Sequence, residues 1–302
     1  MLDILARAGC YIAIILLGNI LRRKGFFGPE TFGVLSKIVI KITLPAALIA
    51  SSAGRPIDAS MLSISLMGLG FGVLYMLGGY LISRRQSRDQ QAFAMLNTPG
   101  YNIGTFALPF TSSFLGPMGV ITTSLFDVGN SFICLGGAFG VARAVKEGGK
   151  MDVKRMLKAP MTSIPFLTHL VMVTLNLNGW NLPSPVVELA GIIGNANAFL
   201  AMLMIGVGFK LSGEKSQLGS IFRILSVRYG LAVVLALGIY FLLPFALEVR
   251  QTLVILAFAP IGSAIPVFTA ELKEDVGLSS AINSISIVIS IVIIVTLLVV
   301  ML

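Results

Sequence analysis

Hydrophobic residues along this chain are grouped into long stretches, each about as long as a membrane span, and polar residues are grouped into the short segments between them. Apolar stretches of about 20 residues, the length that crosses the hydrocarbon core of a bilayer, follow one another with short polar segments between them. Ten such stretches can be read, at roughly 4–21, 32–52, 61–83, 91–111, 119–141, 160–177, 186–209, 222–245, 250–270 and 277–301. The pattern predicts an all-α integral membrane protein with ten transmembrane helices, numbered below as spans 1 to 10.

The basic residues of the connecting segments alternate from one segment to the next. The even-numbered connections and the N-terminal end hold only Arg7, Arg55 and Arg250. The odd-numbered connections hold most of the others: Arg22, Arg23, Lys24, Arg84, Arg85, Arg88, Arg143, Lys146, Lys150, Lys154, Arg155, Lys158, Lys210, Lys215 and Lys273. Because Lys and Arg collect in cytoplasmic loops, the odd-numbered connections are predicted to be cytoplasmic. The interpretation is a multi-pass protein of the cell (inner or plasma) membrane with both termini extracytoplasmic.

The spans divide into two halves that enter the membrane from opposite faces. Residues 1–141 form a first five-helix repeat, 142–159 a cytoplasmic basic loop, and 160–302 a second five-helix repeat. Five is an odd number, so homologous halves would form an inverted repeat. Residues 103–109 read IGTFALP and residues 261–266 read IGSAIP, each in the fourth span of its half. Inverted repeats with interrupted helices at corresponding positions are typical of secondary transporters.

Both copies of this phrase contain residues that break a helix. Proline lacks the backbone N–H and clashes with the carbonyl one turn back, and glycine adds backbone freedom. Spans 4 and 9 are therefore expected to unwind near the middle of the membrane, where freed N–H groups suit an anion and freed carbonyls a cation. The predicted substrate-binding residues are Asn102, Gly104, Thr105, Pro109, Pro260, Gly262, Ser263, Pro266 and Lys41, with the polar contacts weighted towards span 4.

Ionisable residues deep in a membrane are functional hypotheses by default. Asp127, near the middle of span 5, is a candidate to hold a coupling proton or Na⁺ together with Asn130; the alternative is a structural ion pair. Lys41 in span 2 is a candidate to attract an anionic substrate or to neutralise Asp127. Arg228 is interpreted as snorkelling to the cytoplasmic face, and His169 as a hydrogen-bonded packing residue rather than a proton relay.

Composition narrows the class of protein further. Only 12% of the residues are charged and the mean hydropathy is +0.94, which leaves too few charges to cover a water-facing surface. The net charge of +9 does not indicate nucleic-acid binding, because the basic residues flank apolar spans. Cys10 and Cys134 are expected to be buried free thiols, which supports neither a disulfide framework nor a metal site.

Several motifs resemble those of a known family. Asn102 lies seven residues ahead of Pro109, with Gly104 between them, and Ala107 replaces the glycine nearest that proline. Three other segments also match: Leu44-Pro45-Ala46 in span 2, Asp127-Val128-Gly129-Asn130 in span 5, and Ala259-Pro260 through Ala270-Glu271 in span 9. Span 10 fits with Ser279, Ser280 and Asn283. The chain resembles the auxin efflux carrier family, within the broader bile-acid, arsenite and riboflavin transporter group.

The resemblance implies a fold and an activity. It implies ten helices with helices 4 and 9 broken and crossing, a scaffold of helices 1, 2, 6 and 7, and a transport domain of helices 3–5 and 8–10. The implied activity is secondary transport of a small organic anion, such as a dicarboxylate or auxin, by elevator-type alternating access. Na⁺ and H⁺ are the candidate coupling ions, and no other cofactor is expected. Besides the substrate and the lipid bilayer, the expected partner is a second copy, in a homodimer through the scaffold helices.

Two other functions compete with a carrier. An intramembrane enzyme needs a metal motif, a pair of carboxylates or a Ser–His dyad, and the chain offers one histidine and one deep carboxylate. A channel tends towards symmetric subunits around a repeated selectivity element, which an inverted repeat does not favour. The sequence therefore predicts a carrier and not an enzyme.

Overall fold

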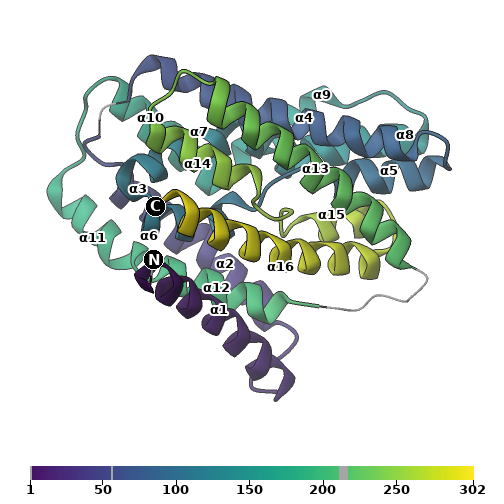
Figure 1. The fold of residues 1–302 in the computed structure, drawn as a ribbon, viewed down its shortest axis with the longest axis horizontal. Coiled ribbons are helices and arrows are strands. Elements are labelled where there is room, and N and C mark those ends of the chain that lie inside the picture. The colour runs from purple at the N-terminus through teal and green to yellow at the C-terminus, as the bar shows by residue number, and fades with distance from the viewer. Residues whose placement is uncertain (1, 56, 211–216) are drawn as a thin grey trace.

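The computed structural model describes residues 2–55, 57–210 and 217–302, and every regular element in those residues is helical (Figure 1). Lys215, one of the basic residues used for orientation, lies outside the described residues. The elements of the first half are α1 (Leu2–Arg23), α2 (Thr31–Ile38), η1 (Val39–Thr43), α3 (Leu44–Ser52), η2 (Ala59–Leu62), α4 (Ser63–Ser83), α5 (Arg88–Asn97), η3 (Ile103–Ala107), α6 (Leu108–Phe114), α7 (Gly116–Phe132), η4 (Ile133–Gly137) and α8 (Ala138–Glu147).

The second half begins with a short helix on the predicted basic loop. Its elements are α9 (Val153–Lys158), η5 (Pro160–Thr162), α10 (Ile164–Leu177), α11 (Ser184–Gly194), α12 (Asn197–Gly208), α13 (Leu218–Leu242), α14 (Leu247–Ala257), α15 (Ile265–Glu271) and α16 (Val276–Met301). Most predicted spans thus correspond to one helix or to a run of consecutive helical segments.

The lengths of these helices support a membrane protein. Within the described residues, seven helices are long and apolar enough to cross a bilayer. An eighth candidate is the pair Val153–Thr162 and Ile164–Leu177, which bends by 78° at its break. The two remaining predicted spans, 91–111 and 250–270, are each interrupted and consist of shorter helices. The prediction of an all-α membrane protein is confirmed at this level.

Prolines explain two of the irregular helical turns. Pro45 and Pro109 each stand in the first turn of a short α-helix, and a π-helical segment precedes each one. The N–H of Leu44 bonds to the carbonyl of Val39, and the N–H of Leu108 to that of Ile103, so both bonds span five residues instead of four. This wider turn keeps hydrogen bonds ahead of a residue that lacks an N–H.

The helices pack mainly within two groups. α1 packs along α12, and α3 lies against α10 and α11; in the other group α4 packs on α5, α7 and α13, and α14 on α7 and α13. In Figure 1, α1, α2 and α12 lie along the lower side and α4, α5 and α8 at the upper right, with α16 running between them. Contacts of α7 with α3 and α10 connect the groups.

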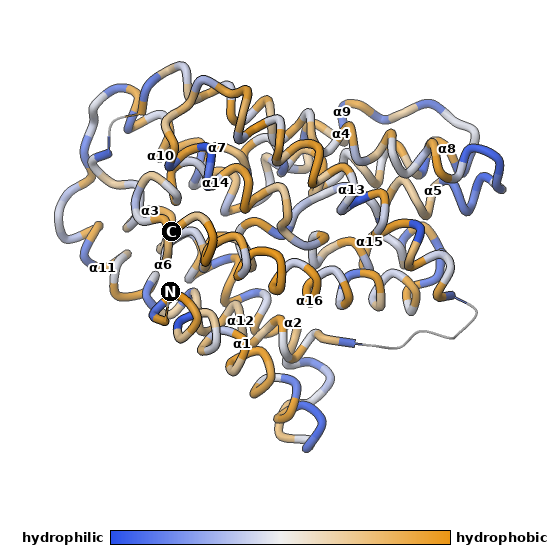
Figure 2. The backbone as a smooth tube through the Cα atoms, in the orientation of Figure 1, coloured by the Kyte–Doolittle hydropathy of each residue, from blue (hydrophilic) through white to orange (hydrophobic). Residues whose placement is uncertain are grey.

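The surface of the molecule suits a bilayer. Large apolar side chains point outwards from several helices, including Leu66 (71% exposed), Phe241 (70%) and Val300 (76%). Figure 2 shows the hydrophilic segments gathered at the ends of the helices, most clearly beyond α8 and after α1. Cys10 belongs to the outward-facing set, so the expectation that it is buried is wrong; both cysteines are free.

Candidate functional site

The two interrupted helices meet at their breaks. α5 ends at Asn97 and regular structure resumes at Ile103, while α14 ends at Ala257 and α15 begins at Ile265. The backbone N–H of Asn102 donates a 2.8 Å hydrogen bond to the carbonyl of Pro260. In the first half the unwound residues hold Pro99 and Gly100 and come directly before the repeated phrase, whose residues 103–109 are helical; in the second half they include Pro260 and Gly262. Both predicted breaks are therefore present, and the unwound segments contact each other.

The first break is held by an asparagine of the next membrane span, which contains α7. Asn130 of α7 accepts a hydrogen bond from the N–H of Tyr101 through Oδ1 and donates one to its carbonyl through Nδ2, both at 3.0 Å. Such a two-way contact replaces the partners that a continuous helix would supply. Gly100 allows the chain to enter this segment because its φ is +79°, a left-handed conformation that favours glycine.

The second break is held in a similar way from α16. Asn283 donates from Nδ2 to the carbonyls of Ile261, at 2.9 Å, and Gly262, at 3.2 Å. The hydroxyl oxygen of Ser286 accepts a 3.2 Å hydrogen bond from the N–H of Ile261. Each unwound segment is thus braced by the next membrane span along the chain, α7 for the first break and α16 for the second.

Arg228 of α13 joins the two breaks. Its guanidinium donates to the carbonyl of Thr98 at 2.6 Å and to that of Ala259 at 2.8 Å. It also lies over the rings of Tyr75 and Tyr101, 5.2 and 5.1 Å from their centroids. The side chain is only 1% exposed, so the interpretation of Arg228 as a snorkelling residue is wrong. The carbonyls that unwinding frees attract this cation inwards.

A cavity of about 690 Å³ reaches the crossover from the predicted cytoplasmic side. Its mouth is formed by the segment after α1, the end of α12 and the start of α16, and Asn102 and Ser263 lie at the breaks. The polar and charged lining residues are Arg22, Asn102, Lys210, Ser263, Ser280, Asn283 and Ser284. No acidic side chain is among the lining residues in the part of the chain that the structure describes.

Asn102 has the chemistry of a ligand contact. Its side-chain oxygen accepts a short hydrogen bond from the hydroxyl of Thr105, but its Nδ2 is buried without a hydrogen-bond partner. An unpaired buried donor is costly, at about 1–3 kcal/mol. A group that accepts a hydrogen bond from Nδ2 in the cavity would remove that cost, and an anionic oxygen is the strongest such acceptor.

The structure brings most of the predicted substrate-binding residues to the crossover. Asn102, Ser263 and Pro266 line the cavity, while the others at the breaks lie in the unwound segments or beside them: Gly104, Thr105, Pro109, Pro260 and Gly262. Gly104 leaves room for Leu44, whose Cδ2 would lie 2.6 Å from an added Cβ. Lys41 is exposed on η1 and does not line this cavity.

Asp127 has a partner that the sequence did not indicate. Its Oδ2 lies 3.4 Å from Nε2 of His169 on α10, and its Oδ1 accepts a 2.9 Å hydrogen bond from Asn130. Lys41 therefore does not serve as the neighbour of this carboxylate. His169 is buried, as expected of a packing residue, but it packs against an ionisable group.

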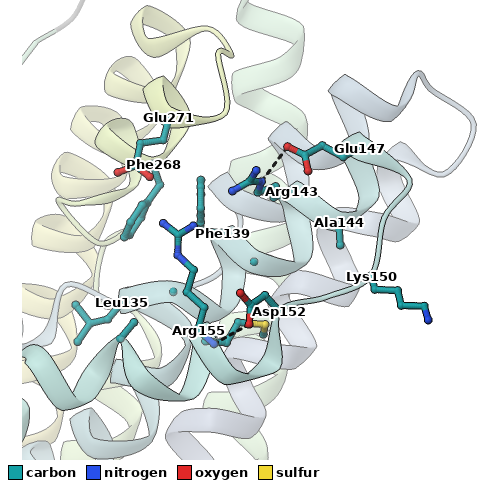
Figure 3. Close-up of a pocket in the computed structure, with 14 residues that line it drawn as sticks. Leu135, Phe139, Arg143, Ala144, Glu147, Lys150, Asp152, Arg155, Phe268 and Glu271 are labelled. Carbon is teal, nitrogen blue, oxygen red and sulfur yellow. Dashed lines mark hydrogen bonds and ion pairs between the residues drawn. The ribbon is translucent and has the colours of Figure 1, made fainter.

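A second cavity, of about 390 Å³, lies between α8, α9 and α15 (Figure 3). Its lining holds charges of both signs. Arg143 forms a 2.8 Å ion pair with Glu147, and the side chain of Asp152 accepts a 2.9 Å hydrogen bond from the backbone N–H of Arg155. The guanidinium of Arg155 lies 5.9 Å from the ring centroid of Phe139. Because acidic side chains are among the lining residues, this cavity suits an anion less well than the crossover cavity.

An all-helical apolar chain whose interrupted helices meet at a polar cavity has the architecture of a membrane transporter. Residues 11–155 match the family model described as membrane transport protein. That part of the chain belongs to this family, which confirms the resemblance to the auxin efflux carriers. No curated protein sequence matches the chain. The family is one of transporters and not of enzymes, in agreement with the sequence-based expectation.

Several residues of the site were missed by reasoning from the sequence. Arg22 and Lys210 were counted only as loop charges, and Ser284 was not considered. Ser280 and Asn283 entered only through the resemblance of span 10. The available signal was the spacing of Ser280, Asn283 and Ser284, polar residues about one helical turn apart on an otherwise apolar span.

Proposed function

We propose that the protein is a secondary active transporter of a small organic anion. The observation that carries this proposal is the crossover cavity, which combines Arg22 and Lys210 with hydroxyl and amide donors and an unpaired Nδ2 on Asn102. A volume of about 690 Å³ falls in the range of small-molecule sites, about 300–1,000 Å³. Cationic and neutral donors without a carboxylate among the described lining residues favour an anionic ligand.

The proposed mechanism is elevator-type alternating access in a fold of ten helices arranged as two inverted repeats. Helices 1, 2, 6 and 7 form the scaffold, and helices 3–5 and 8–10 form a transport domain that carries the site. The packing of the helices mainly within two such groups supports this division. The proposal includes coupling to H⁺ or Na⁺, a position in the cell membrane with both termini extracytoplasmic, and a homodimer through the scaffold.

Counterflow in proteoliposomes tests the proposed function. Vesicles loaded with unlabelled succinate, malate or indole-3-acetate should take up the same labelled compound saturably for at least one of these probes. A conductance far above the turnover of a carrier would support the channel alternative and contradict the proposal. Absence of counterflow with every probe would contradict an organic-anion carrier of this kind.

Asn102→Ala tests the site itself. Loss of a hydrogen bond to a charged group costs about 1.5–3 kcal/mol, so the affinity for the transported probe should fall about 10- to 100-fold. The matched control is Asn178→Ala, which removes an exposed amide near the end of α10. Equal affinities for wild type, Asn102→Ala and the control would remove Asn102 from the site.

A further inference from the structure

A pair of titratable side chains crosses the boundary between the two helix groups. Asp127 lies on α7 and His169 on α10, with 3.4 Å between Oδ2 and Nε2. The relative exposures are 9% for Asp127 and 3% for His169. α7 belongs to the proposed transport domain and α10 to the proposed scaffold, so movement of one domain along the other must break this contact.

The pair is connected to the substrate cavity by one side chain. The Nδ2 amide of Asn130 donates both to Oδ1 of Asp127, at 2.9 Å, and to the carbonyl of Tyr101, at 3.0 Å. Tyr101 directly precedes Asn102, whose amide lies at the cavity. A change in the protonation of Asp127 therefore acts on the unwound segment that carries the proposed substrate contact.

Six carbonyls at the crossover already accept hydrogen bonds. Arg228 occupies those of Thr98 and Ala259, Asn130 that of Tyr101, and Asn283 those of Ile261 and Gly262. The carbonyl of Pro260 accepts from the N–H of Asn102. A Na⁺ ion needs several oxygen ligands that do not already accept hydrogen bonds. A fixed guanidinium in the same place also repels a second cation.

Other ionisable groups on the neighbouring elements do not pair with Asp127 or His169 within the described chain. On η1, Lys41 is exposed; at the start of α14, Arg250 donates to the carbonyl of Tyr240 and Glu248 lies in the first turn. Cys134 donates to Oδ1 of Asn130 at 3.3 Å, and on α4 Tyr75 lies against Arg228. Within the described chain, the contact with each other is the only ion pair that Asp127 and His169 form.

We propose that the coupling ion is a proton and that the Asp127–His169 pair binds it. This inference rests on the proposed transport function and identifies the ion that drives it. One proton on the pair permits two arrangements. With the proton on the imidazole, an ion pair joins α7 to α10. With the proton on a carboxyl oxygen of Asp127, both side chains are neutral, and α7 can pass α10 without carrying a bare charge through an apolar interface.

Without the proton, Asp127 is a buried carboxylate beside a neutral imidazole. With the substrate anion also bound, movement of the transport domain would then take an uncompensated negative charge across the interface, which is strongly unfavourable. Once substrate and proton have left, the transport domain returns with the negative charge of Asp127 balanced by the positive charge of Arg228, which the same domain holds at its breaks. The proton enters on one side of the membrane with the substrate anion and leaves on the other. Substrate movement is thereby tied to proton movement, with one substrate charge compensated for each proton carried.

The first experiment needs no substrate, because the chain has a single histidine. Protein labelled at histidine, with any polyhistidine tag removed, is reconstituted in nanodiscs and followed by NMR from about pH 4 to about pH 9, a range around the ordinary histidine pKa near 6.5. The imidazole should titrate, and Asp127→Asn should change its midpoint. Thr174→Ala, on the exposed side of α10, should leave it unchanged. An imidazole insensitive to pH, or a midpoint equal in Asp127→Asn and wild type, would overturn the inference.

The second experiment separates coupling from transport. Proteoliposomes that show counterflow with succinate, malate or indole-3-acetate are given either a pH gradient or a Na⁺ gradient. One pH unit, acidic outside, should raise accumulation of the labelled probe up to about tenfold for each coupled proton. Asp127→Asn should keep counterflow and lose this accumulation, and His169→Gln should shift the pH profile of uptake.

The outcomes of these experiments distinguish the proposed transport function from the proposed coupling to protons. Accumulation driven by Na⁺ and not by the pH gradient would overturn the proton inference while counterflow upholds the carrier. Absence of counterflow with all three probes would overturn the carrier, and the NMR titration would still decide whether the pair binds a proton. Unchanged pH-driven accumulation in Asp127→Asn would exclude Asp127 as the coupling group.

Discussion

The breaks in spans 4 and 9 are built alike but surrounded differently. Asn130 holds the first and Asn283 the second, each from the next membrane span along the chain. Three residues before Asn130 stands Asp127, which pairs with His169; three residues before Asn283 stands Ser280, which lines the cavity. One break is thus tied to the Asp127–His169 contact between the two helix groups, and the other faces the cavity.

The polar lining of the cavity is also distributed unequally between the two halves. The polar contacts were expected to be weighted towards span 4, yet Asn102 is the polar lining residue from that span. Ser263 from span 9 and Ser280, Asn283 and Ser284 from span 10 supply more of the polar lining. The two breaks share similar backbone contacts, but the side chains around them differ. In the proposed mechanism, coupling is assigned to the first half and recognition is weighted to the second.

Arg228 contacts both breaks, so substitution of this residue removes an interaction that the two breaks share. Arg228→Met leaves the carbonyls of Thr98 and Ala259 unpaired, each at a cost of about 1–3 kcal/mol, and removes two ring contacts. Relief of the buried charge offsets part of this, so we expect a loss of about 2–4 kcal/mol. Thermal unfolding in detergent measures it, with the exposed Arg223→Met on the same helix as control. Equal midpoints for both variants would show that Arg228 does not hold the breaks together.

The difference between the breaks can be reduced by Ser280→Asp, which gives the second break an acidic residue at the corresponding place. A carboxylate in the cavity repels an anionic substrate, and like charges a few ångströms apart cost about 1–4 kcal/mol in water or near a protein surface. The affinity for the transported probe should therefore fall at least about tenfold. Ser280→Asn, similar in shape and uncharged, serves as control in the same counterflow assay. A loss of equal size in both variants would indicate a steric effect and no anion selectivity at Ser280.

The sequence was sufficient for features that depend on local backbone chemistry. Pro99, Gly100 and Pro109 in one span and Pro260 and Pro266 in another predicted both breaks, because proline and glycine act on the chain wherever it folds. Side-chain partners depend on tertiary distance. Nothing in the spacing of Asp127 and His169, 42 positions apart along the chain, indicates that they meet.

The contacts of Arg228 also could not be predicted from the sequence. Its depth along span 8 allowed either snorkelling or burial, and the choice depends on acceptors that other helices provide. The carbonyls of Thr98 and Ala259 become available only because spans 4 and 9 are unwound and lie beside α13. A residue whose environment is made by two other broken helices cannot be assigned from its own neighbours in the sequence.

The smallest expected effect concerns two glycines, one in the backbone of each break. Gly100 has a φ of +79° and an added Cβ would lie 2.8 Å from Sγ of Cys134, whereas a Cβ on Gly262 would make an ordinary 3.5 Å contact with the same atom. Gly100→Ala should therefore destabilise the protein by about 1–2 kcal/mol, the cost of a left-handed residue with a side chain. Gly262→Ala should change stability by no more than about 0.5 kcal/mol, as for substitutions without strain. Thermal unfolding of both variants measures the difference. A larger loss in Gly262→Ala than in Gly100→Ala would mean that the second break, and not the first, depends on backbone freedom.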